Sequence, residues 1–318
     1  MKDFSRLATE SVDGWDAICP KLIQSCMSKD KSPLYCLAWT RFGKSLLIGA
    51  HSGEALKLNG STFAHEDDYS MHKAAIVSMI LSHNENLLAS GDSSGEIRLW
   101  DRNMKLVKGF LDQAALHTES IRDISFAPGD NKMVTCSDDK IAKVTDIETG
   151  KQDVVFLRHG AEVKACQWHP HKGLIMSGGK DNFGKLWDPK SGDELCTLYA
   201  HHQQINKIRW HSNGNWVMTA SKDTTVRVHD IRTMKTIANF QQHKKEVTSI
   251  AWHPSIEDLL VSGAADNSLI YWSMKDLTII KEVTQAHGKE VSDILWHPLG
   301  HVLATCSQEN TAKVWCNI

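Results

Sequence analysis

The chain has 318 residues, of which 41% are hydrophobic and 23% are charged, a composition typical of a folded protein rather than a disordered one. Its formal net charge is −2, so an anionic partner would need a local basic patch. No apolar run approaches the ~18 residues of a membrane-spanning helix. The eight cysteines form no C-x-x-C pair and no zinc-ligand pattern, so we interpret them as reduced, intracellular thiols and predict no metal site.

Three segments precede the regular part of the chain. Residues 1–16 include acidic residues and lack the apolar region of a secretory signal, so we assign them as an N-terminal extension. Residues 17–27 have the composition of a strand but belong to no repeat. Residues 33–60 indicate three strands separated by turns, with Trp39 near the end of the first.

A repeat begins at residue 72. A histidine recurs in steps of 42 to 45 residues, at His72, His117, His159, His201, His243 and His287. A tryptophan-aspartate slot follows each histidine with nearly the same steps, and its first position holds Trp100, Thr145, Trp187, His229, Trp272 and Trp315. Two landmarks with a period near 40–45 residues are typical of a four-stranded β-propeller blade. Six such units and residues 33–60 predict seven blades.

The interior of one unit supports this interpretation. Between His159 and Trp187, a first strand ends at Trp168 before a His-Pro pair. A second strand is expected at 174–177 and an outer strand at 194–199, with the third ending at Trp187. Alternating polarity and Gly, Pro and Asp at the breaks favour strands over helices.

The two ends of the chain predict how the ring closes. The chain ends three residues after Trp315, so the last blade would have only three strands of its own. We predict that residues 17–27 supply its fourth strand, because this pairing removes exposed sheet edges. The predicted fold is therefore an all-β, seven-bladed propeller spanning residues 17–318 and closed by an N-terminal strand in the last blade.

A polar signature also repeats. Two complete copies are His159, Ser177, Asp181 and Trp187, and His243, Ser262, Asp266 and Trp272. A Ser/His/Asp set can indicate a hydrolase, but a catalytic set would occur once. We therefore predict buried structural relays, with no catalytic residue and no cofactor. Ser94 at the aspartate position of blade two and Thr145 at the tryptophan position of blade three should make those blades looser.

Several stretches resemble a known family. "FAPGDNKMVTCSDDK", "NGNWVMTASKD" and "WHPLGHVLATCS" are similar to the WD40-repeat subunit of the cleavage and polyadenylation specificity factor, within a resemblance covering residues ~30–316. The resemblance implies a nuclear scaffold in pre-mRNA 3′-end processing. Its implied partners are a large multi-propeller subunit and a zinc-finger subunit, together with RNA carrying the AAUAAA signal. No membrane partner is expected.

The same resemblance implies RNA-binding residues. It carries over two positions, Lys29 and His65, and Phe63, two residues before the second, is a further RNA-binding candidate. An imidazole ring can stack on a base. Lys31, Arg41 and Lys44 extend a basic cluster near blade one, which could hold phosphate. The alternative is an ordinary solvated rim.

A second function remains open. The triplet Asp230-Ile231-Arg232 matches the D-x-R cue of substrate receptors of cullin-type ubiquitin ligases, although the triplet is common in WD repeats. Four lysines, Lys180, Lys222, Lys244 and Lys245, should lie on one face of the disc. That face could receive a partner or could simply be solvated.

Overall fold

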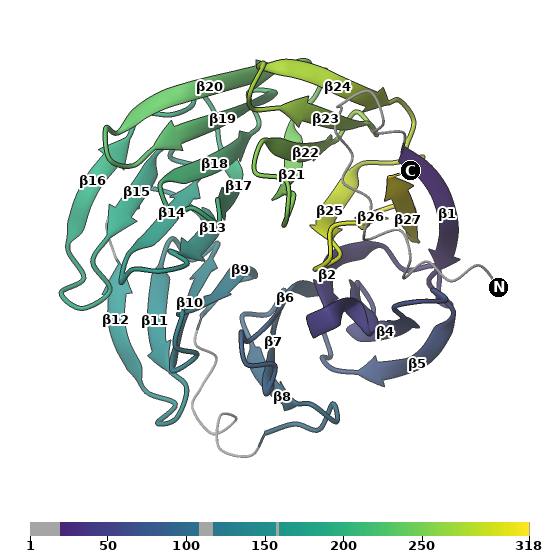
Figure 1. The fold of residues 1–318 in the computed structure, drawn as a ribbon. Coiled ribbons are helices and arrows are strands. Elements are labelled where there is room, and N and C mark those ends of the chain that lie inside the picture. Colours follow the sequence, from purple (N-terminus) through teal and green to yellow (C-terminus); the bar gives the residue numbers. More distant parts are fainter. Residues whose placement is uncertain (1–19, 108–116, 157–158, 318) are drawn as a thin grey trace.

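The computed structural model describes residues 20–107, 117–156 and 159–317, without the side chains of Arg41 and Asn317. Seven antiparallel sheets stand around a common centre, which confirms the predicted all-β, seven-bladed propeller (Figure 1). The one helical element of the described residues is the short 3-10 turn η3 (Arg41–Gly43). None of the helical structure in the described residues has the length and apolar character needed to cross a membrane.

The blades follow one another in chain order, each built from the centre outward. Blades one to three comprise β2 (Leu34–Trp39), β3 (Ser45–Ala50), β4 (Glu54–Asn59) and β5 (His65–Ser70); β6 (Ile76–Leu81), β7 (Leu87–Asp92) and β8 (Ile97–Asp101); and β9 (Ile121–Phe126), β10 (Lys132–Ser137), β11 (Ala142–Asp146) and β12 (Gln152–Phe156). Within its described residues, blade two thus has three strands, and its bridge between Trp100 and Leu106 begins a further pairing.

Blades four to seven continue the ring. They comprise β13 (Val163–Trp168), β14 (Ile175–Gly179), β15 (Gly184–Trp187) and β16 (Glu194–Leu198); β17 (Ile205–Trp210), β18 (Trp216–Ser221), β19 (Thr225–Asp230) and β20 (Lys235–Gln241); β21 (Val247–Trp252), β22 (Leu259–Ala264), β23 (Leu269–Ser273) and β24 (Thr278–Val283); and β25 (Val291–Trp296), β26 (Val302–Ser307), β27 (Thr311–Asn317) and β1 (Pro20–Met27). The strands expected within 159–199 all form, with ends that shift by no more than a few residues.

The N-terminal strand closes the last blade, as predicted. β1 pairs antiparallel with β27 from Pro20 opposite Asn317 to Met27 opposite Thr311, along the outer rim (Figure 1). The described strand begins at Pro20, so residues 17–19 of the expected strand lie outside the described residues, as does the extension 1–16. This pairing gives the outer edge of β27 a hydrogen-bonded partner from the other end of the chain.

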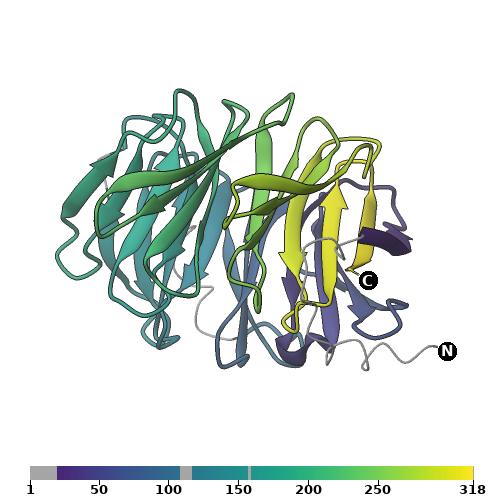
Figure 2. The same cartoon turned by 45° about the horizontal axis from the view of Figure 1, so that its top comes forward.

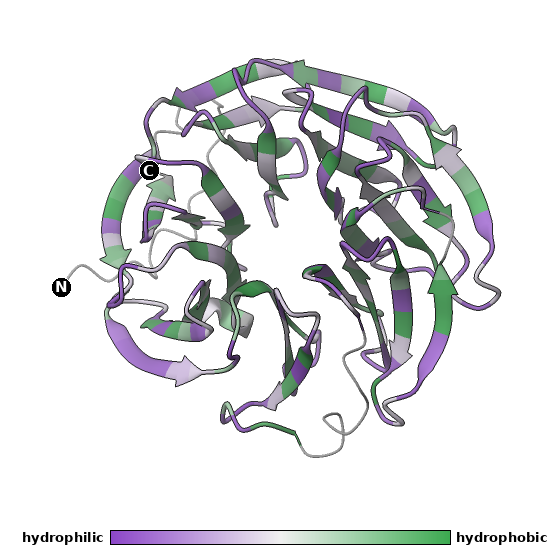
Figure 3. Ribbon diagram, turned by 180° about the vertical axis from the view of Figure 1, so that it is seen from behind, coloured by the Kyte–Doolittle hydropathy of each residue, from purple (hydrophilic) through white to green (hydrophobic). Residues whose placement is uncertain are grey.

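Most of the hydrophobic core lies between neighbouring sheets. Gly91 on β7 faces Ile121 and Ile124 of the next blade so closely that a Cβ atom would collide with them. The second strands are buried along almost their whole length, because sheets pack on both of their sides. The outermost strands are mostly exposed or half-buried, and their ribbons mix hydrophilic and hydrophobic residues around the rim (Figure 3).

The antiparallel strands place the loops on two faces of the disc (Figure 2). We call one the histidine face: it holds the loops that lead into each first strand, including His159 and its equivalents, and the turns between second and third strands. The opposite face holds the turns between first and second strands and between third and fourth strands. These two surfaces and the rim are where a partner can bind.

Candidate functional site

The repeated polar set forms a buried relay in blade four. The Trp187 indole N–H donates to Ser177 Oγ at 2.7 Å, and Ser177 Oγ lies 2.6 Å from His159 Nε2. His159 Nδ1 lies 2.8 Å from an oxygen of Asp181. Since the carboxylate can only accept, Nδ1–H donates to it and the hydroxyl donates to Nε2. Ser177 is completely buried, so the hydroxyl cannot meet a substrate.

The same chain of contacts recurs around the ring. In blade six, His243 Nε2 lies 2.7 Å from Ser262 Oγ, to which Trp272 donates at 2.8 Å, while Nδ1 lies 3.2 Å from Asp266. Blade seven repeats it with Thr305 and Glu309. The geometry therefore assigns these Ser, His and Asp side chains to fastening loop, turn and strand within each blade.

Blade two contains a complete relay, which the sequence of its turn did not predict. Ser94 does occupy the usual aspartate position, but Asp92, two residues earlier, supplies the carboxylate and lies 3.1 Å from His72 Nδ1. His72 Nε2 and the Trp100 indole both contact Ser90 Oγ, at 2.7 and 2.8 Å. The expectation of an incomplete relay in blade two is therefore corrected: the end of β7 replaces the turn as the source of the carboxylate.

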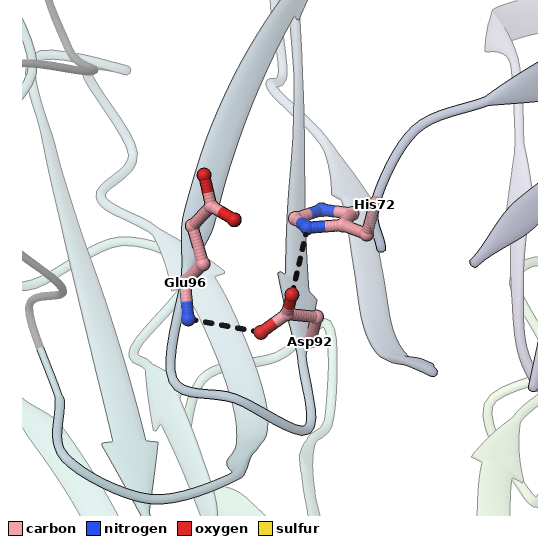
Figure 4. Close-up of side chains that lie close together, drawn as sticks. All are labelled: His72, Asp92 and Glu96. Atoms are coloured by element: carbon pink, nitrogen blue, oxygen red, sulfur yellow. Dashed lines mark hydrogen bonds and ion pairs between the residues drawn. The ribbon is translucent and has the colours of Figure 1, made fainter. Parts of the chain in front are cut away.

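The group His72, Asp92 and Glu96 brings potential metal ligands within 4.8 Å of one another (Figure 4). Asp92 accepts hydrogen bonds from His72 and from the backbone N–H of Glu96. The Glu96 carboxylate is held by Arg98 at 2.8 and 3.0 Å. Hydrogen bonds within the protein therefore use these groups, and the pKa of Asp92 falls to about 2 because the bonds from His72 and Ser94 outweigh its burial.

Two other blades vary the relay. In blade three, Thr145 fills the tryptophan position, and its hydroxyl is buried without a hydrogen-bond partner within the described ranges, whereas His117 keeps its contacts with Thr135 and Asp139. In blade five, His229 replaces the tryptophan, and its Nε2 lies 3.1 Å from Thr219 Oγ1. Burial lowers the pKa of His229 to about 3, so this imidazole is neutral and can act as the N–H donor that the indole provides elsewhere.

The resemblance-derived residues Lys29 and His65 meet at the rim. Lys29 follows β1 and forms an ion pair with Asp68 of β5, while His65 Nε2 lies 2.6 Å from the other oxygen of the same carboxylate. The loop after β1 and the outer strand β5 of blade one thus contribute one residue each around Asp68. Burial opposes the charge of Asp68, but the bonds from His65 and Lys29 lower its pKa. Asp68 belongs to no repeated motif of the sequence and was not among the predicted residues.

The structure places the other basic-cluster residues at two faces. Lys31 is exposed beside the start of β2 on the histidine face, and Lys44 is exposed beyond its end on the opposite face. The six residues of β2 span about 20 Å, so the two lysines do not form one patch. The backbone of Arg41 lies in η3 on the side of Lys44, and its side chain lies outside the described part of the structure.

Phe63 lies in the core rather than at the surface. Its side chain is 5% exposed and packs edge-on against Trp39, with ring centroids 6.5 Å apart. Its backbone has a φ of 56°, in the left-handed region, in the turn that leads to His65. A ring in this position has no free face on which a base could stack, so we take Phe63 as a support for the turn that presents His65.

The remaining candidate residues lie as follows. Lys180, Lys222, Lys244 and Lys245 occupy turns and loops of the histidine face in three successive blades, and Lys180 pairs with Glu162 at 3.0 Å. Arg232 lies on the opposite face, where Asp230 accepts hydrogen bonds from its guanidinium at 3.1 and 2.6 Å. The Arg232 side chain is nevertheless 62% exposed.

A family model and several curated proteins match this chain. The model of the "WD domain, G-beta repeat" matches residues 64–101, 114–146, 150–188, 192–230, 234–273 and 279–316, more than half of the chain. These segments correspond to the six units that carry the histidine landmark. Blade one, which lacks that histidine, is matched only over its last strand.

Fungal proteins named polyadenylation factor subunit 2 are among the similar curated proteins. Identity is 33% with the Candida albicans protein (42% of this chain, 24% of that protein) and 33% with that of Neurospora crassa (52% and 24%). For the Cryptococcus neoformans protein it is 36% (46% and 20%). The matched segments thus span a quarter or less of the length of these relatives.

Proposed function

The chain belongs to the WD-repeat family, and from this premise we propose that it is a scaffold subunit of the nuclear machinery that cleaves and polyadenylates pre-mRNA. The observation that carries this proposal is the 33–36% identity with three fungal polyadenylation factor subunits over about half of the chain. In the proposed role, the disc docks on a large multi-propeller subunit beside a zinc-finger subunit. It also helps to hold RNA carrying AAUAAA.

A scaffold role agrees with the chemistry of the fold. Each described relay is hydrogen-bonded inside its blade, and its hydroxyl oxygen is buried. The exposed faces and rim remain available to partners. Because fold does not determine function, the identity of the partners rests on the resemblance and not on the propeller itself.

The proposed RNA contact is the rim site formed by Lys29, His65 and Asp68. A phosphate that approaches Lys29 would compete with Asp68, and an imidazole released from that carboxylate could stack on a base. Since Asp68 already neutralises this small basic site, binding by the isolated chain should be weak. Partner subunits that supply further phosphate contacts would raise the affinity.

The test reconstitutes the full chain with the multi-propeller and zinc-finger subunits. Co-purification of the three is expected, and a failure of the chain to associate with the large subunit would overturn the scaffold proposal. Fluorescence anisotropy with an AAUAAA oligomer and a scrambled oligomer then measures RNA binding at several salt concentrations. Lys29→Ala should weaken binding by the complex, whereas Lys244→Ala, at an exposed lysine of the histidine face, should leave it unchanged.

Arg232 favours one second candidate function. Its exposed guanidinium and the Asp230-Ile231-Arg232 triplet fit a substrate receptor that docks on the adaptor of a cullin-type ubiquitin ligase. Binding of purified chain to such an adaptor, abolished by Arg232→Ala, would support this function. Equal adaptor binding by the wild type and the variant would exclude Arg232 as the contact.

A further inference from the structure

Histidine side chains join neighbouring blades on the face of the disc opposite the histidine face. The residue after the first strand donates through Nε2 to a carbonyl in the first turn of the next blade: His169 to Gly214 at 2.7 Å, His211 to Glu257 at 3.1 Å and His253 to Gly300 at 2.9 Å. His297 makes the equivalent contact with Gly43 and so joins the last blade to the first. We call the boundary between two neighbouring blades on this face a seam. An imidazole ring fills each of these four seams.

Three of the four acceptor residues are glycines, for a steric reason. Gly43, Gly214 and Gly300 have φ between 65° and 81°, and a Cβ atom on any of them would collide with the histidine ring that reaches it. The fourth acceptor, Glu257, lies in a longer turn, residues 253–258. In turns of the shorter length, the histidine therefore requires the glycine.

The seam between blades one and two has neither residue. Thr40 stands in the histidine position, and its Oγ1 is used within its own blade, where it accepts from the Ser45 N–H at 2.8 Å. Glu85 stands in the glycine position, with a φ of 57°. Arg102 of the same blade donates to the carbonyls of Asn84 and Glu85, both at 3.2 Å, and so occupies the acceptor that an incoming histidine would need.

This substitution leaves a cleft of about 690 Å³ at the seam, within the size range of small-ligand pockets. Thr40, Phe42, Lys44, Glu85, Arg102 and Met104 are among its lining residues. Phe42 is 65% exposed at its edge. The cleft therefore combines an aromatic face, apolar surface and charged groups.

Only some of the charged groups of the cleft have a hydrogen-bond or ion-pair partner among the described residues. One carboxylate oxygen of Glu85, Oε1, is buried and has no hydrogen-bond partner among the residues that the structure describes. Lys57 pairs with Glu66 at 3.0 Å, whereas neither Lys44 nor Arg102 has a carboxylate partner within those residues. Because Oε1 is buried, the Glu85 side chain must turn towards the cleft before an occupant can reach both of its oxygens. A buried acceptor without a donor is costly, so an occupant that supplies an N–H group to the turned carboxylate would be favoured.

We propose that this cleft binds one nucleotide of a single-stranded RNA. The base would stack on Phe42 and donate an N–H group to Glu85, and the phosphate would lie near Lys44 and Arg102. A nucleotide combines the three properties that the lining asks for: a flat apolar face, an N–H donor and an anionic group. The cleft is on the face opposite Lys31, and none of its lining residues belongs to the rim site around Asp68.

The carboxylate of Glu85 also determines which bases the cleft should bind most tightly. Guanine presents two adjacent N–H donors to a single carboxylate, whereas adenine and cytosine present one amino group. The uracil N–H is flanked by two carbonyl oxygens, which a carboxylate repels. We therefore expect guanine to bind most tightly and uracil most weakly.

The test titrates the full-length chain with labelled hexamers UUGUUU and UUUUUU and follows fluorescence anisotropy. Glu85→Gln should weaken UUGUUU binding at least about fivefold, the lower limit for one lost base contact, and should change UUUUUU binding little. Lys44→Ala should weaken both oligomers and reduce the salt dependence. Lys172→Ala, an exposed lysine in the equivalent turn of blade four, is the matched control and should have no effect.

Two further measurements show whether a free nucleotide suffices as the ligand and distinguish the cleft from the rim site. Displacement of UUGUUU by free GMP would show that one nucleotide suffices, and binding without displacement would show that the neighbouring RNA backbone is required. Lys29→Ala should leave this binding intact, so failure of the rim site and failure of the cleft are distinguishable. Wild-type affinity for UUGUUU in both Glu85→Gln and Lys44→Ala would overturn the proposal and favour a protein segment as the occupant.

Discussion

His72 is hydrogen-bonded to Asp92, which is 20 positions later, although blades three, four and five take the carboxylate from the residue 22 positions after the histidine. Blade two thus preserves the contact while changing the residue that makes it. We expect Asp92→Asn to lower the free energy of unfolding by about 1–3 kcal/mol, since it weakens a buried hydrogen-bonded pair. Urea unfolding measures the change, and Ser94→Ala, at the usual carboxylate position, should have a much smaller effect.

The same pair predicts a dependence on pH. The pKa of Asp92 is about 2 in the folded protein, below its ordinary value of 3.8. The unfolded chain therefore binds the proton first, and the contribution of Asp92 to stability is present above pH ~4 and lost as the pH falls towards 2. Thermal unfolding of wild type and Asp92→Asn should converge across this range. Parallel curves would contradict the assignment.

His229 predicts sensitivity to milder acid. Burial holds its folded pKa near 3, below the ordinary 6.5, so protonation favours the unfolded chain as the pH falls below about 6.5. One such histidine should reduce the free energy of unfolding by about 2 kcal/mol between pH 7 and pH 5. His229→Trp introduces the residue found at this position in blades two, four, six and seven and should remove this part of the loss. Urea unfolding of both proteins at the two pH values provides the comparison.

The pairing of β1 with β27 predicts that the N-terminal strand is needed for a closed ring. Removal of residues 1–27 should expose the edge of β27, lower the melting temperature and cause association of chains. Light scattering and thermal unfolding would detect both effects. Removal of residues 1–16 alone is the control and should leave the oligomeric state and the melting temperature unchanged.

Asp68 predicts a gain of RNA binding. Asp68→Asn removes the carboxylate that neutralises Lys29 and holds His65, so the affinity of the reconstituted complex for RNA should rise. The slope of log affinity against log salt should steepen by about 0.7, the value for one further phosphate contact on a single strand. An unchanged affinity and slope would show that Lys29 does not contact phosphate.

We expect replacement of Phe63 to reduce the stability of the fold and not to remove a contact with RNA. Phe63→Ala empties a site packed against Trp39 and should cost about 3–5 kcal/mol of unfolding free energy. Phe63→Leu keeps most of the volume and should lose much less. RNA binding by the folded Phe63→Leu complex should match that of wild type. A selective loss of RNA binding without a loss of stability would show that the ring does meet RNA.

The repeated features were predictable from the residues, because each blade is a local unit. The histidine and tryptophan-aspartate periods indicated seven blades, and the relays of blades four and six form as expected. The ring closure by β1 followed from a missing strand and the instability of a free sheet edge. Asp92 escaped prediction because a carboxylate two residues away from the usual turn can reach the same imidazole only once the backbone places it there.

Contacts between blades were decided by the tertiary structure. Lys29 and His65 are 36 positions apart in the chain, and only closure of the ring brings the outer strand of blade seven beside that of blade one, where both side chains reach Asp68. Thr40 and Glu85 likewise belong to different repeats, and the sequence shows each only as a local departure from its own turn. Their shared consequence, a seam without a histidine, depends on which side chains the packed blades place opposite each other. Periodicity thus determined the number and order of the blades, whereas packing between them determined which residues form surfaces for binding.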